Sequence, residues 1–165
     1  MDNEKFLKAF NKVHLIMTLI AWCIIICMLI YVLVVYNDLD DIIGVHFSGN
    51  GEFDIYDSKA YIFYPFVVGI GLNVIFGLFT LLMKKFKSGM KISEAGELRA
   101  KSYLRVGIDF MKICLSLFFS YWAYCVVVQN PLNMETVGAW AFLALFIDIL
   151  LIIAMLITIR IKYRK

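Results

Sequence analysis

Long apolar runs divide this sequence into four blocks. They cover residues 13–36, 61–83, 106–128 and 136–159, and polar segments separate them. About 20 residues at a rise of about 1.5 Å cross the hydrocarbon core of a bilayer, so each run is long enough to span a membrane as an α-helix. The pattern predicts an all-α membrane protein, a four-transmembrane-helix bundle that forms a single membrane domain over residues 1–165.

Lysine and arginine lie mostly on one side of the predicted membrane. Of the 16 in the chain, three lie in the leader 1–12, seven in the connector 84–105 and four after residue 159. The loop 37–60 contains only Lys59. Short loops rich in lysine and arginine stay in the cytoplasm. Both termini and the basic connector are therefore predicted to be cytoplasmic, and the loop 37–60 is predicted to be extracytoplasmic.

The composition supports a membrane protein and gives no sign of a metal or cofactor site. The chain is 62% hydrophobic and 18% charged, whereas a soluble domain is nearer about half apolar and about a quarter charged. All the cysteines lie inside the apolar runs, so we expect no disulfide framework. They are Cys23, Cys27, Cys114 and Cys125. No spacing of cysteine and histidine is typical of a zinc site, and no cofactor is predicted.

The loop 37–60 carries most of the candidate chemistry. It is acidic, it holds glycines that permit a reversal of the chain, and it contains a single histidine, His46, followed by Asp54, Asp57 and Lys59. A histidine beside carboxylates can titrate near neutral pH or contribute to a metal site, although this ligand set is sparse. The alternatives are a surface for a peptide or partner, and hydrogen bonds that merely hold the loop together.

The spacing of residues in this loop resembles a known membrane domain. The residues that carry the resemblance are Leu39, Asp41, Ile43, His46, Phe47, Gly51, Asp54, Ser58 and Lys59. They resemble a short domain of unknown function that occurs in SdpI-type bacterial immunity proteins, and the similarity covers about residues 30–83. It implies a protein of the bacterial cytoplasmic membrane that protects against a membrane-active peptide or toxin. The binding residues that it implies are His46, Phe47, Gly51, Asp54 and Lys59.

Two positions depart from the pattern of that domain. Asp40 and Gly44 stand where its members usually have proline. Because proline fixes the backbone and glycine frees it, we expect a less rigid loop in this chain.

Three ionisable residues interrupt the apolar runs: Asp109, Lys112 and Asp148. A charge at the centre of a bilayer costs about 2.5–3.5 kcal/mol on insertion scales. Asp109 is expected within a turn of the cytoplasmic end, and Lys112 is expected to extend toward the same end. Asp148 falls near the predicted midplane, where Lys112 is its nearest expected partner and Asn73 is expected close by. Either a structural interhelical pair or a proton or substrate site fits this pattern.

Three classes of function follow. The first is a protective protein that binds a peptide toxin or a membrane protein through its outer loop. The second is a small proton-coupled transporter that uses Asp148, and the third is an accessory subunit of a membrane complex. An enzyme is not expected, because no nucleophile–base set or phosphate-binding loop stands out. The protein is expected to lie in the lipid bilayer and to bind no nucleic acid, and the sequence does not decide whether it forms a homo-oligomer. His14 is expected at the cytoplasmic membrane interface.

Overall fold

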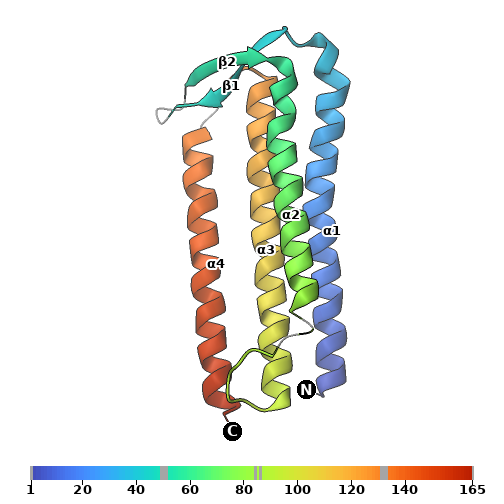
Figure 1. Cartoon of the computed structure of the whole chain (residues 1–165), viewed down its shortest axis with the longest axis vertical. Coiled ribbons are helices and arrows are strands. Elements are labelled where there is room, and N and C mark those ends of the chain that lie inside the picture. The colour runs from blue at the N-terminus through green and yellow to red at the C-terminus, as the bar shows by residue number, and fades with distance from the viewer. Residues whose placement is uncertain (1, 49–51, 84, 86, 131–133, 165) are drawn as a thin grey trace.

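Four long helices and one β-hairpin make up the computed structural model of the chain (Figure 1). The structure describes residues 2–48, 52–83, 85, 87–130 and 134–164. The helices are α1 (Asn3–Val35), α2 (Tyr64–Leu82), α3 (Glu94–Val127) and α4 (Met134–Lys162). All four are long and apolar enough to cross a membrane, which confirms the predicted fold class. Both termini lie at the end of the bundle opposite the hairpin.

Three of the helices, α1, α3 and α4, extend beyond the apolar runs at the end where the termini lie, whereas α2 stays within its run. α1 begins at Asn3, ten residues before the predicted start at residue 13, and α3 begins at Glu94 inside the predicted connector. Ser93 caps α3, because its side chain accepts a hydrogen bond from the Gly96 amide at 3.3 Å. Two acidic residues in the first turn, Glu94 and Glu97, stabilise the helix because their carboxylates lie near the positive end of the helix dipole. Helices α1 and α3 therefore begin in polar sequence, before their apolar runs begin.

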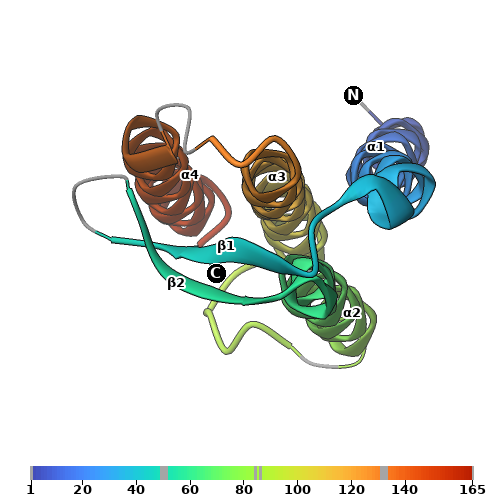
Figure 2. The same cartoon turned by 90° about the horizontal axis from the view of Figure 1, so that it is seen from above.

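The segment predicted as a loop over 37–60 contains regular structure. Strand β1 (Ile42–Phe47) pairs antiparallel with β2 (Phe53–Ser58). Short 3-10 helices flank them, η1 (Tyr36–Asp38) and η2 (Lys59–Phe63). Residues 53–57 alternate apolar and polar side chains only in part, and so short a pattern does not predict a strand from periodicity alone. Seen from above, the hairpin lies over the start of α2 and runs beside the ends of α3 and α4 (Figure 2).

Helix α3 is the centre of the bundle. It packs against α1, α2 and α4, whereas α4 contacts the rest of the molecule mainly through α3 (Figures 1 and 2). Two glycines of α3 permit this close approach. A Cβ on Gly107 would lie 2.4 Å from Cδ1 of Ile152, and one on Gly96 would lie 2.6 Å from Cβ of Tyr163.

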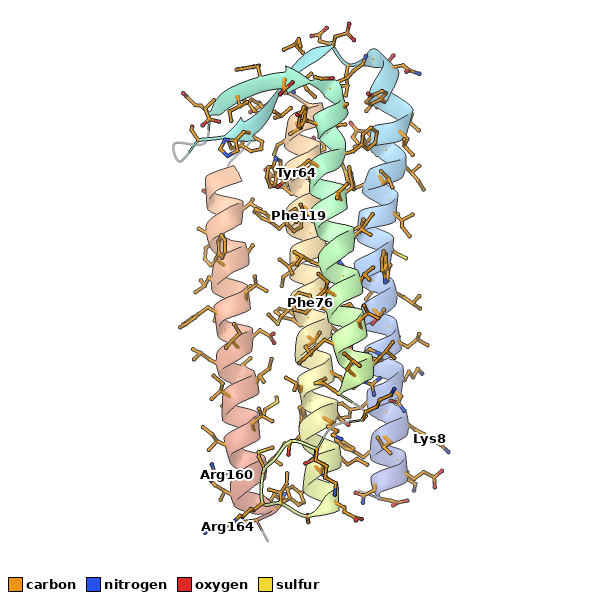
Figure 3. The ribbon with its side chains drawn as sticks, viewed as in Figure 1. Lys8, Tyr64, Phe76, Phe119, Arg160 and Arg164 are labelled. Carbon is orange, nitrogen blue, oxygen red and sulfur yellow. The ribbon has the colours of Figure 1, made fainter. Side chains whose placement is uncertain are left out.

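A buried apolar cluster joins the hairpin to the helices. Its fully buried members include Ile43 of β1, Ile62 of η2, Val32 of α1 and Val126 of α3. By contrast, large apolar side chains are exposed along the outer faces of the helices, as expected for surfaces that contact lipid. At the opposite end, Figure 3 shows Lys8, Arg160 and Arg164 around the two termini.

Candidate functional site

The hairpin is held together by side chains that face each other across its strands. Nδ1 of His46 lies 2.6 Å from Oδ1 of Asp54, and both side chains are partly exposed. The rings of Phe47 and Phe53 tilt against each other with centroids 4.6 Å apart. The structure therefore brings together His46, Phe47 and Asp54, three residues implicated by the resemblance. Gly51, a fourth, lies outside the described residues.

Lys59 ties the end of the hairpin to the end of α1. Its Nζ donates a hydrogen bond to the carbonyl oxygen of Leu39 at 3.0 Å and lies 3.2 Å from Oδ1 of Asp41. The same ammonium lies over the ring of Tyr36, 5.4 Å from its centroid. Because Lys59 also begins η2, this one side chain fixes the distance between α1 and the entry to α2.

A second tether joins the hairpin to the end of α3. The amide of Gly44 donates a hydrogen bond to Oε1 of Gln129 at 2.8 Å. Gln129 has a positive φ of 48°, in the turn that follows α3. Gly44 pairs with Tyr56 in the sheet and its amide is bound to Gln129, so this position has fixed partners, and the expected loosening of the loop stays a prediction. Proline at this position would lack that N–H. Sequence reasoning missed Gln129, since nothing in its neighbours indicates a tether.

A hollow of about 420 Å³ lies along α3 and α4, and another of about 400 Å³ lies beneath the hairpin. The hollow beneath the hairpin is lined by His46 and Asp57 of the hairpin, by Tyr61 of η2, by Tyr64 at the start of α2, and by Trp122 of α3. Tyr64 is seen at this end of the bundle in Figure 3. Aromatic rings and two ionisable groups thus border one recess, a composition suited to an amphipathic ligand.

A buried polar network crosses from α1 to α3 inside the bundle. Lys112 is 2% exposed and Asp109 is fully buried. Nζ of Lys112 donates hydrogen bonds to Oδ1 of Asp109 and to Oγ1 of Thr18, both at 3.0 Å. Thr18 donates to the same carboxylate at 3.1 Å, and Nδ1 of His14 lies 2.5 Å from Oδ2 of Asp109.

The structure gives both of these charges buried partners. Asp109 is fully buried, fifteen residues after α3 begins at Glu94. Lys112 extends toward the start of α3, as expected, because its ammonium meets Asp109 three residues earlier; Asp109 and Thr18 hold it within the bundle. Sequence reasoning also missed the contributions of His14 and Thr18. Their separation of four residues places both on one face of α1, which is the only sequence signal that relates them.

Asn73 lies at the next level of the bundle. Its Nδ2 donates to the carbonyl oxygen of Gly69 at 2.9 Å and to Oγ of Ser116 at 3.1 Å. Ser116 in turn donates to the carbonyl oxygen of Lys112 at 2.7 Å. Asn73 therefore links α2 to α3, and it does not join Lys112 to Asp148 as expected.

Asp148 stands apart from this network. It lies midway along α4 and is 7% exposed. Its Oδ2 has no hydrogen-bond partner among the described residues. The expected pair with Lys112 is wrong, because that ammonium is bound between α1 and α3. Among the described residues, no three histidine, cysteine or acidic side chains gather in a way that would hold a metal ion.

A match to a known family includes the hairpin. Residues 23–70 match a family described as a domain of unknown function, DUF1648. Comparison with curated proteins and with solved structures finds no match.

The DUF1648 match covers less than a third of the chain. It runs from the C-terminal part of α1 through the hairpin and η2 into the first turns of α2. His46, Phe47, Asp54 and Lys59 fall within it, whereas Asp109, Lys112 and Asp148 lie beyond it. The match confirms the resemblance to a membrane domain of unknown function.

Proposed function

We propose that this chain is a protein of the bacterial cytoplasmic membrane that binds a cationic amphipathic peptide on its hairpin and so protects the bilayer from that peptide. The observation that carries the proposal is the fixed hairpin, tethered by Lys59 and Gln129 above an aromatic hollow. A preformed surface lowers the entropy cost of binding. The resemblance to SdpI-type immunity proteins supports the protective role.

The charge of the hairpin end favours a cationic ligand. Between residues 37 and 60 the only lysine or arginine is Lys59, and its ammonium is already bound to Leu39 and Asp41. The acidic residues of the same segment are Asp38, Asp40, Asp41, Glu52, Asp54 and Asp57. A surface of one sign attracts ligands of the other sign and repels those of its own.

The sheet offers a means of holding such a peptide. The sheet contains two strands, and β1 is the strand that contacts α3. β2 lies on the other side of β1 (Figure 2), so one edge of β2 faces away from it. An extended peptide adds to an unpaired edge through main-chain hydrogen bonds. Ile55 and Tyr56 of β2 are about half exposed and give the added strand apolar contacts.

Fluorescence of Trp122 provides a direct test. The protein is purified with Trp22 and Trp140 replaced by phenylalanine, so that only the tryptophan beside the hollow reports. A synthetic peptide of alternating leucine and lysine is expected to shift this fluorescence saturably, and a leucine–glutamate peptide is not. Asp54→Asn and Asp57→Asn should each weaken binding about fivefold, as for the loss of one exposed charge contact. Glu4→Gln, at the opposite end of the molecule, is the matched control.

Two results would contradict the proposal. One is an unchanged Trp122 signal with both peptides, and the other is equal binding of the two peptides. In cells, loss of this protein should raise sensitivity to cationic membrane-active peptides. Complementation with His46→Ala or Asp54→Ala should fail even though these variants reach wild-type levels in the membrane.

A further inference from the structure

Within the part of the chain that the structure describes, one oxygen of the Asp148 carboxylate has no polar partner, although the residue is nine-tenths buried. It is 7% exposed, and its Oδ2 has no hydrogen-bond partner among the described residues. Buried polar atoms in folded proteins are nearly always partnered, so each exception needs an explanation. The nearest lysine of α3, Lys112, is bound by Asp109 and Thr18.

Asp148 lies in a groove that is otherwise almost wholly apolar. The groove has a volume of about 420 Å³ and is formed by α3 and α4, with Met17 of α1 at one side. This volume is within the range of about 300–1,000 Å³ that is usual for small-molecule sites. Gly107 also lines the groove, and because it lacks a side chain Ile152 packs closely against it: an added Cβ would lie 2.4 Å from Cδ1 of Ile152 and 3.6 Å from Oδ1 of Asp148.

The groove opens on the side of the bundle and not at its ends. Phe110, Ile147 and Leu151 line it and are themselves between 39% and 54% exposed. Because Asp148 is midway along α4, this opening lies at the depth of the hydrocarbon core if the helices span a bilayer. A ligand that enters here comes from the lipid phase and must be largely apolar.

To pair with the carboxylate of Asp148, such a ligand needs a positive charge. The groove also places the rings of Tyr103 and Phe110 along its wall, and aromatic faces attract organic cations. We propose that Asp148 and this groove form a binding site for a lipophilic organic cation, an apolar amine or onium ion, whose charge pairs with the carboxylate and whose substituents contact α3 and α4. This site is independent of the function proposed for the hairpin.

Tetraphenylphosphonium is a suitable probe for the site. Its saturable binding is measured by equilibrium dialysis on the purified full-length protein in detergent, with empty micelles subtracted. Asp148→Asn keeps the size and shape of the side chain and removes its charge. It is expected to weaken binding about tenfold or more, because a buried ion pair is lost. Asp2→Asn, an exposed aspartate before α1 whose side chain makes no capping hydrogen bond, is the matched control and should leave affinity unchanged.

A second variant and a second ligand separate charge from shape. Ala144→Trp fills the groove and leaves Asp148 intact, so it should abolish saturable binding. Triphenylphosphine oxide, a neutral analogue, should bind the wild type and Asp148→Asn equally. Absence of saturable tetraphenylphosphonium binding to the wild type would overturn the proposal, and Asp148 would then be a packing residue. Wild-type affinity in Asp148→Asn would also overturn it. If Asp148→Asn does not fold, unchanged binding to Ala144→Trp is sufficient to reject the site.

Discussion

At the scale of single residues, pairing decides what each buried charge does. Asp109 and Lys112 lie three residues apart on α3 and satisfy each other, with His14 and Thr18 completing the set from α1. Asp148 on α4 is similarly buried, yet one of its oxygens is unpartnered among the described residues. A complete network serves packing and helix register, whereas an incomplete one leaves a group available to a ligand.

The Asp109–Lys112 pair yields a prediction about stability. Asp109→Leu should lower the free energy of unfolding by about 3–5 kcal/mol, because it leaves the ammonium of Lys112 buried without its partner. The double variant Asp109→Leu with Lys112→Leu should recover most of that loss, since neither charge then needs a partner. Unfolding of the purified protein in detergent, followed by circular dichroism, measures both.

The exposed pair Glu4–Lys8 is the control for this cycle. Its oxygen and nitrogen are 3.0 Å apart, as close as the buried pair, but both side chains are more than 70% exposed. Lys8→Met should change stability by less than about 1 kcal/mol. A double variant of Asp109 and Lys112 that is no more stable than Asp109→Leu alone would show that the two residues do not act as a pair.

At the scale of elements, the hairpin is ordered by contacts with helices rather than by its own two strands. An isolated two-stranded hairpin is only marginally stable in water. Here Gly44 is bound to Gln129 after α3, Lys59 is bound to Leu39 after α1, and Ile43 is buried between the helices. The surface proposed for peptide binding therefore depends on the ends of α1 and α3 as much as on the hairpin sequence.

A substitution at Gln129 can remove its hydrogen bond to Gly44 without changing any residue of the strands. Gln129→Asn keeps a residue that tolerates positive φ and shortens the side chain by one methylene, so that it no longer reaches Gly44. Amide hydrogen exchange in β1 should become about fivefold faster, as for the loss of one hydrogen bond worth about 1 kcal/mol. Asn37→Ala, at an exposed position of η1, is the control. Unchanged exchange in β1 would mean that the apolar cluster alone orders the hairpin.

At the scale of the whole molecule, charge and shape are distributed along one axis. The hairpin, with its acidic residues, covers one end of the bundle, and both termini lie at the other end with Lys8, Arg160 and Arg164 (Figures 1 and 3). Cationic loops are retained in the cytoplasm during insertion. In this arrangement the segment predicted to face outward is the hairpin, and the segments predicted to be cytoplasmic lie at the opposite end of the bundle.

Cysteine labelling tests that orientation. In a chain whose four cysteines are replaced by alanine, an impermeant maleimide applied to intact cells should modify Asp40→Cys beside the hairpin. It should not modify Lys91→Cys, which lies before α3, until the membrane is opened. Both positions are exposed, so access to the reagent is limited by the membrane alone. Labelling of Lys91→Cys in intact cells would reverse the orientation and remove the proposed role of the hairpin outside the cell.

The sequence by itself determined the four helices, because runs of apolar residues near the thickness of a bilayer have few other structures open to them. It also located the segment that matches DUF1648, since the spacing of His46, Asp54 and Lys59 is local in the chain. Helix ends were less well determined. Polar residues that favour a helix, such as those from Glu94 onward, look the same in a sequence whether or not the helix continues into the bundle.

Only the tertiary structure decided which polar groups meet. His14 and Asp109 are 95 residues apart in the chain, and Gly44 and Gln129 are 85 apart. Contacts of this kind depend on which helix faces which and at what depth. A count of residues from each membrane surface placed Lys112 beside Asp148, but it contains no information on helix rotation. Rotation about the helix axis directs Lys112 to α1 and Asp148 into the groove between α3 and α4, because packing of the apolar faces fixes the direction of every polar side chain on the same helix.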